Sequence, residues 1–112
     1  MGVSSCSLGT IQNHNRIEGK IPNAISHLRV LKQLSLSENK LTGAIPGPSL
    51  NRLVHLEKLL LSSNKLTGRI PWEINDLANL AELSVTGNQM MKESEVMQER
   101  RQKQLPNCLI RY

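Results

Sequence analysis

Residues 28–46 read LRVLKQLSLSENKLTGAIP, and residues 53–71 read LVHLEKLLLSSNKLTGRIP. The two stretches share leucines, an asparagine, a glycine and an Ile-Pro pair at the same relative positions. Related units lie on either side, because asparagines recur at Asn15, Asn39, Asn64 and Asn88, at intervals of 24, 25 and 24 residues. Repetition at a fixed period of this size predicts a solenoid, in which each unit needs its neighbours to bury its apolar face.

Each part of the unit has a physical role. The alternation Leu34-Ser35-Leu36 predicts a short strand whose two leucines face inwards. The asparagine that follows is expected to be buried, so its amide needs partners, which stacked coils supply from their backbones. Glycine then allows a tight bend, and proline ends the strand. We therefore expect the four asparagines to form a ladder inside the stack, with Ile25, Leu50 and Ile74 facing inwards from the outer side.

These units resemble the leucine-rich repeat family, and in particular its plant-type subclass, whose pattern LxxLxxLxLxxNxLTGxIPxxIxxL they match almost completely. The resemblance covers about residues 15–90. It implies an α/β solenoid, a short right-handed stack of coils with a parallel concave sheet of about four to five strands. Receptor-like kinases and receptor-like proteins carry such repeats in their ectodomains. A helical protein with scattered leucines is the alternative, but proline recurs at Pro22, Pro46 and Pro71, and it is incompatible with helix interiors.

The first unit departs from the pattern. Thr10 and Gln12 hold the places of the two strand leucines, with Ile11 between them. Either this strand slips by one residue, or the unit is an atypical terminal coil. A further irregularity is one extra residue within Gly47-Pro48-Ser49, which accounts for the single interval of 25 and is interpreted as a loop insertion.

The C-terminal segment is different in kind. Residues 93–104 contain no Gly or Pro and are rich in helix formers, and Ser94 stands where a cap is expected. Residues 108–112 alternate as a strand, so we expect a helix over the convex side and a strand at the sheet edge. The apolar stripe of this helix is thin, formed by Val96, Met97 and Leu105. A frayed tail is the alternative, because Arg100 and Arg101 interrupt that stripe.

The length of 112 residues suits one domain. We expect an atypical first coil over residues 1–27, regular repeats over 28–90, and a helix-and-strand cap over 91–112. Phe is absent, so the core must consist of Leu and Ile. The net charge of +5 without a basic block beside aromatics argues against a nucleic-acid partner. No apolar run approaches the roughly 20 residues of a membrane span, so no membrane insertion is expected.

The cysteines bear on the compartment. Cys6 and Cys108 would be separated by about four coils, on the order of 20 Å, whereas a disulfide needs Cα atoms within about 7 Å. Unpaired thiols, the lack of a visible secretory signal and the lack of an N-x-Ser/Thr acceptor favour an intracellular protein. An extracellular or membrane-associated location is expected instead if the chain is a fragment of a receptor.

The concave face is the predicted binding surface, because solenoid curvature makes it an extended groove. Its expected contact residues are Gln33, Ser35, Ser37, Glu38, Lys58, Leu60, Ser62, Glu82, Ser84 and Thr86, with Leu109 and Arg111 from a terminal strand. The expected partner of a monomeric chain is another protein or peptide. A solvated sheet without a specific ligand, and a structural coil stack without a partner, are the alternatives, because this face has almost none of the Trp, Tyr and Arg residues typical of hot spots.

Two further features could make contacts. Arg16, Lys40, Lys65, Lys20 and Arg69 form a basic column that would suit an acidic partner, although such positions are usually just solvated. Trp72 is either an exposed contact anchor or a ring folded over the coil edge.

Catalysis finds no support in the sequence. The histidines occupy non-equivalent repeat positions, and no zinc-type cysteine spacing or Ser-His-Asp arrangement is visible. We therefore expect no catalytic residues, metal or cofactor. The function predicted is a non-catalytic protein–protein interaction module. The alternative is a fragment or truncated relative of a plant-type leucine-rich repeat receptor kinase that acts in ligand perception and signalling.

Overall fold

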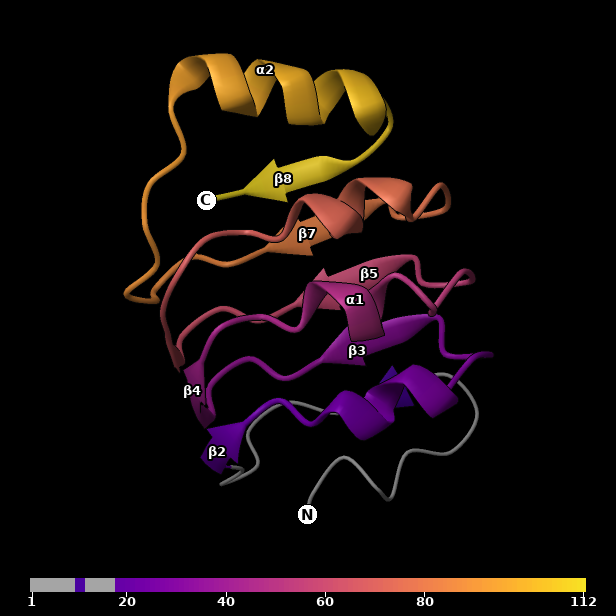
Figure 1. The fold of residues 1–112 in the computed structure, drawn as a ribbon, viewed down its shortest axis with the longest axis vertical. Coiled ribbons are helices and arrows are strands. Elements are labelled where there is room, and N and C mark those ends of the chain that lie inside the picture. The colour runs from indigo at the N-terminus through magenta and orange to yellow at the C-terminus, as the bar shows by residue number, and fades with distance from the viewer. Residues whose placement is uncertain (1–9, 12–17) are drawn as a thin grey trace.

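The computed structural model describes residues 10–11 and 18–112 as a stack of coils (Figure 1). In each regular coil a strand of one sheet is followed by a turn and a short helical segment of the opposite layer. The strands are β1 (Thr10–Ile11), β2 (Glu18–Lys20), β3 (Gln33–Ser35), β4 (Lys40–Gly43), β5 (Lys58–Leu60), β6 (Lys65–Leu66), β7 (Glu82–Ser84) and β8 (Leu109–Arg111). The helical segments are η2 (Asn23–His27), α1 (Gly47–Leu50), η3 (Trp72–Asp76) and α2 (Glu95–Gln104).

Two parallel sheets hold the coils together. The larger has five strands in the order β1-β3-β5-β7-β8, and the smaller has three in the order β2-β4-β6. Neighbouring strands come from successive coils, so Leu34 pairs in register with Leu59, and Leu59 with Leu83. The predicted α/β solenoid with a parallel concave sheet is therefore confirmed.

The core consists of repeated aliphatic layers. The strand leucines Leu34, Leu59 and Leu83 are fully buried, because the in-register pairing stacks them on one another between the two layers of the coil. Ile25, Leu50 and Ile74 close the core from the opposite side and are also buried. Equivalent positions thus bury equivalent side chains, as the period of the sequence predicts.

The outer layer contains one departure from the repeat. Two coils form 3₁₀ segments after Pro22 and Pro71, whereas the coil with the extra residue forms α1, a single α-helical turn. The interpretation as a loop insertion was therefore wrong, because the additional residue is absorbed by the wider helical turn. Gly47 at its start packs so closely on η3 that a Cβ there would lie 2.5 Å from Cβ of Pro71.

The first strand slips by one residue relative to the asparagine spacing. Thr10 pairs with Gln33 and Ile11 with Leu34, whereas the interval of 24 residues would have placed Thr10 opposite Leu34. Of the two alternatives for this unit, the slipped strand is confirmed. Gln12, Asn15, Arg16 and Cys6 lie outside the described residues.

The predicted C-terminal helix and strand are present. α2 starts after Ser94, whose Oγ accepts a hydrogen bond from the backbone N–H of Met97 at 3.3 Å. β8 pairs in parallel with β7 and forms the edge of the five-stranded sheet. In Figure 1, α2 lies at the end of the stack, beyond β8. No helix among the described residues is long and apolar enough to cross a membrane.

α2 buries only part of the predicted apolar stripe: Leu105 is buried and Met97 is partly buried. Val96 is 58% exposed, whereas Arg101 is only 1% exposed and is among the largest fully buried side chains of the described chain. The expectation that Arg101 interrupts a buried stripe was wrong, because its guanidinium group finds hydrogen-bond acceptors inside the protein.

Candidate functional site

Three rows of side chains cross the outer surface of the five-stranded sheet. The first row runs from Gln33 through Lys58 and Glu82 to Leu109, which are in register on successive strands. The second row contains Ser35, Leu60, Ser84 and Arg111. The third is a row of hydroxyl groups, Ser37, Ser62 and Thr86, in which Oγ of Ser62 donates a hydrogen bond to Oγ of Ser37 at 3.0 Å. The rows bring the sequence-predicted contact residues other than Glu38 onto one surface, whereas Glu38 lies in the turn before Asn39.

These residues offer unequal amounts of surface. Ser35, Ser37 and Ser84 are each buried to more than nine-tenths, so they form the floor of the surface. Leu60 lies on the central strand between Ser35 and Ser84 and is partly exposed. Because its neighbours are short, the sides of Leu60 remain open to a partner. Leu109, at the sheet edge, is 52% exposed.

Beneath this sheet the asparagines connect successive coils. Asn64 Nδ2 donates hydrogen bonds to the carbonyl oxygen of Leu61 in its own coil at 3.1 Å and of Leu36 in the preceding coil at 2.9 Å. Its Oδ1 accepts the backbone N–H of Leu41, also from the preceding coil, at 3.1 Å. In the same way, Asn88 Nδ2 donates to the carbonyl oxygen of Leu61, and Asn88 Oδ1 accepts the backbone N–H of Leu66. The amide groups are therefore satisfied by backbone groups of two coils.

The turn into each asparagine uses a left-handed residue. Glu38 and Ser63, which precede Asn39 and Asn64, have φ angles of 59° and 57°. The equivalent residue of the fourth unit is Gly87, where this conformation carries no steric cost. Left-handed geometry in two non-glycine residues is tolerated because the bonds of the asparagines fix the turn.

A second site lies at the C-terminal end of the stack, centred on Arg101. Its five N–H groups all donate hydrogen bonds: Nη1 to Pro71 O and Asn75 Oδ1 at 3.1 and 2.9 Å, Nη2 to Ile70 O at 3.1 Å and to Glu93 Oε2, and Nε to Glu93 at 3.2 Å. Nη2 also makes the ion pair with Glu93, whose side chain is 7% exposed. The guanidinium group is thus saturated and its charge is balanced locally.

Trp72 completes this cluster, which we call the Arg101 cluster: Arg101, Glu93, Asn75, Trp72 and the carbonyl groups of Ile70 and Pro71. The Trp72 ring centroid lies 5.1 Å from Cζ of Arg101, within cation–π range. The side chain is nevertheless 44% exposed. Both interpretations of Trp72 therefore hold in part, because the ring covers the coil edge and remains accessible.

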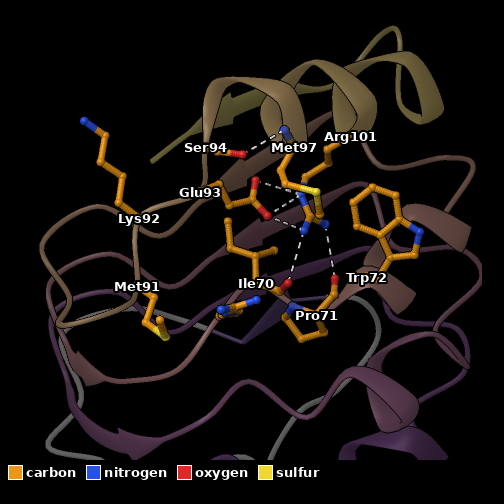
Figure 2. Close-up of a pocket in the computed structure, with 10 residues that line it drawn as sticks. Ile70, Pro71, Trp72, Met91, Lys92, Glu93, Ser94, Met97 and Arg101 are labelled. Atoms are coloured by element: carbon orange, nitrogen blue, oxygen red, sulfur yellow. Dashed lines mark hydrogen bonds and ion pairs between the residues drawn. The ribbon is translucent and has the colours of Figure 1, made fainter.

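An open hollow of about 520 Å³ lies beside the Arg101 cluster. Figure 2 shows Trp72 on one side of Arg101, Met91 and Lys92 on the opposite side, and Ile70 and Pro71 beneath. Arg69 and Met97 also line it. Sequence reasoning missed this site, because its members come from two separate stretches of chain. The available signal was Trp72, an aromatic residue at a position that is Asn23 and Gly47 in the other units.

Two ionisable groups near this end of the stack have raised pKa values. Burial, followed by the charge of Glu93, raises the pKa of Tyr112 to about 12. Burial, assisted by Glu82, raises the pKa of the Cys108 thiol. Both groups therefore stay neutral at physiological pH, and Cys108 is a buried free thiol of low reactivity.

The basic column is only partly aligned. The register of the second sheet pairs Lys65 with Thr42, and Lys20 also with Thr42, so Lys40 and Lys65 do not face each other directly. Lys20, Lys40, Lys65 and Arg69 are all exposed. Within the described ranges, no group of three or more His, Cys, Asp or Glu side chains could hold a metal ion.

Comparisons with known proteins agree with this geometry. The leucine-rich repeat family model matches residues 30–51 and 55–77. No curated protein matches the chain. Among solved structures, a chain of the BIR3–SERK2 complex from Arabidopsis thaliana is 40% identical with a TM-score of 0.68, over 71% of this chain and 43% of that one.

Two other solved structures extend the comparison. The plant peptide hormone receptor RGFR1, solved in complex with RGF2, is 35% identical with a TM-score of 0.74, over 86% of this chain and 15% of the receptor. A leucine-rich repeat protein of Leptospira interrogans is 38% identical with a TM-score of 0.67, over 84% of this chain and 22% of that one. The chain spans less than half the length of each of these proteins. The repeat units, the stacked parallel strands and these similarities lead to one conclusion: the chain belongs to the leucine-rich repeat family and carries repeats of the plant type.

Proposed function

We propose that this chain is a non-catalytic protein-interaction module whose concave sheet binds a protein or peptide partner. Leu60 carries the proposal: a partly exposed apolar side chain stands on the central strand, between the short side chains of Ser35 and Ser84. Apolar contact at the centre of a surface, surrounded by polar groups, is the usual arrangement of a binding interface.

The row of polar side chains beside Leu60 makes the surface asymmetric. Lys58 and Glu82 occupy adjacent register positions on β5 and β7, so a partner meets a positive and a negative group in a fixed order. Such charges contribute specificity and association rate more than affinity. Solved relatives support a protein or peptide as the partner, since their structures are of a BIR3–SERK2 complex and of RGFR1 with RGF2.

The test is a pair of charge insertions followed by partner capture from the native source. Leu60→Glu places a carboxylate at the centre of the concave sheet and should reduce capture of a partner by tenfold or more. Val54→Glu is the matched control, because Val54 is 56% exposed on a turn outside this sheet. Capture that is equal for the wild type and Leu60→Glu, or lost equally in both variants, would contradict binding at the concave sheet.

A second candidate is that the chain acts within a larger plant-type receptor in ligand perception and signalling. Its support is the similarity to receptor ectodomains of which the chain spans only a part. An immunoblot of native tissue with an antibody against residues 95–104 distinguishes the two candidates. A receptor should migrate far above the 12.5 kDa of this chain, whereas an independent module should migrate near it.

A further inference from the structure

We propose that the hollow beside the Arg101 cluster is a second binding site, which takes an acidic peptide segment carrying one large apolar side chain. The site lies outside the concave sheet and does not depend on binding there. Its members come from residues 69–72, which lead into η3, and from residues 91–101, which lead into and include the first turns of α2.

The walls of the hollow suit an apolar side chain. Pro71, Trp72, Met91 and Met97 line it, and both Trp72 and Met91 are about half exposed, at 44% and 56%. Exposed large apolar side chains that converge on a concavity mark binding sites more often than isolated ones do. The two methionines add adaptable walls, because their unbranched side chains adjust to different ligand shapes. The volume of about 520 Å³ accommodates one aromatic side chain with its backbone.

The charges of the hollow select an acidic ligand. Four charged residues line it: Arg69, Lys92, Glu93 and Arg101. Glu93 and Arg101 neutralise each other in the buried ion pair, and all N–H groups of Arg101 are already used. Arg69 and Lys92 are exposed and make no ion pair or hydrogen bond within the part of the chain that the structure describes. The charge left for a ligand is therefore positive.

The surroundings extend this positive field. The backbone N–H groups of Gln89 and Met91 bond the carbonyl groups of Leu66 and Gly68, so the segment before α2 continues the second sheet. That sheet presents Lys20, Lys40 and Lys65 to solvent. Exposed cations on the sheet next to an apolar hollow attract an acidic segment towards it. Figure 2 shows the side chain of Lys92 extending outwards from the hollow, where its ammonium group can meet a ligand carboxylate.

Trp72 makes the proposal directly measurable, because it is the only tryptophan of the chain. The probe is the synthetic peptide GDDFDDG, titrated against the intact chain while Trp72 emission is recorded. We expect a saturable change in emission that weakens with added salt. Two control peptides, GNNFNNG without charge and GDDGDDG without the aromatic side chain, should each bind at least about tenfold more weakly.

Variants assign the binding to this hollow. The double substitution Arg69→Ala/Lys92→Ala should weaken the affinity for the peptide about tenfold, since two cations at the rim of the hollow are lost. The matched control is Arg100→Ala/Lys103→Ala, which removes the same charge from exposed positions of α2 that do not line the hollow and should change affinity less than twofold. Leu60→Glu should leave the peptide affinity unchanged, which separates this site from the concave sheet.

Three results would overturn the proposal. The first is no change in Trp72 emission at peptide concentrations up to about 1 mM, the weak end of specific affinity. The second is equal weakening in the two double variants, which indicates a general attraction to positive charge. The third is loss of peptide binding in the Leu60→Glu variant, which would mean that the peptide binds at the concave sheet.

Discussion

Replacing Arg101 by methionine should strongly destabilise the C-terminal coil. The variant leaves the Glu93 carboxylate without its partner, although that side chain is only 7% exposed. It also leaves three acceptors, Ile70 O, Pro71 O and Asn75 Oδ1, without the guanidinium N–H groups that they accept in the wild type. Breaking a buried pair by removing one partner costs about 3–5 kcal/mol. Since a domain is stabilised by about 5–15 kcal/mol in total, this loss is a large fraction of the free energy of unfolding.

The assay is urea unfolding followed in parallel by Trp72 fluorescence and far-UV circular dichroism. Trp72 stacks on Arg101, so its emission reports the cluster, while circular dichroism reports the whole stack. We expect the fluorescence transition of Arg101→Met to occur at lower urea than that of the wild type. If the end coil unfolds separately, the two probes will no longer coincide.

Two further variants make the comparison quantitative. Arg100→Met is the matched control: the residue type is the same and the helix is the same, but Arg100 is exposed, so its loss should change stability by less than about 0.5 kcal/mol. Arg101→Met/Glu93→Leu removes both charges and should be more stable than Arg101→Met by about 1–3 kcal/mol. A loss below about 1 kcal/mol for Arg101→Met alone would refute the view that this ion pair anchors the coil.

Three other predictions concern single positions. Asn64→Ala removes the bonds to two coils and should cost about 2–4 kcal/mol in urea unfolding; an unchanged midpoint would show that the ladder does not contribute to stability. Gly47→Ala places a Cβ 2.5 Å from Pro71 and should cost about 1–3 kcal/mol, measured as a lower thermal midpoint; a stabilised variant would mean that α1 moves aside freely. The pKa of Tyr112 is raised to about 12, so the unfolded chain ionises first and stability should fall between about pH 10 and 12; Tyr112→Phe should flatten this fall in pH-dependent unfolding, and equal slopes would contradict it.

The repeat made most of the fold predictable. Leu34, Leu59 and Leu83 recur at equivalent places, so the strand pairing and the buried layers follow from the period alone. The C-terminal helix was predictable for a different reason, because local propensity and the Ser94 cap act within a few residues. Both signals are local or periodic, and a single sequence displays them directly.

The Arg101 cluster was not predictable in this way. Arg101 bonds carbonyl groups of Ile70 and Pro71, which lie 31 and 30 residues earlier, and backbone acceptors leave no mark on the side-chain pattern. The sequence therefore presented Arg101 as a polar interruption of an apolar helix face. For the concave surface, the positions of the residues were predictable but their exposure was not. Its residues were placed by alternation, but burial of Ser35 and Ser84 depends on the neighbouring strands and so was not visible.

The bonding of the asparagines has a consequence for how such a chain grows. Asn64 and Asn88 both reach backwards, to backbone groups of the coil that precedes them. A copied unit inserted between two regular coils would find the donors and acceptors it requires on its upstream side and would offer the same groups downstream. Lengthening by tandem duplication is thus compatible with the interior of the array. The segment that Arg101 fastens to the turn at residues 70–71 depends on one side chain that the regular units lack, so copying a regular unit would not reproduce it.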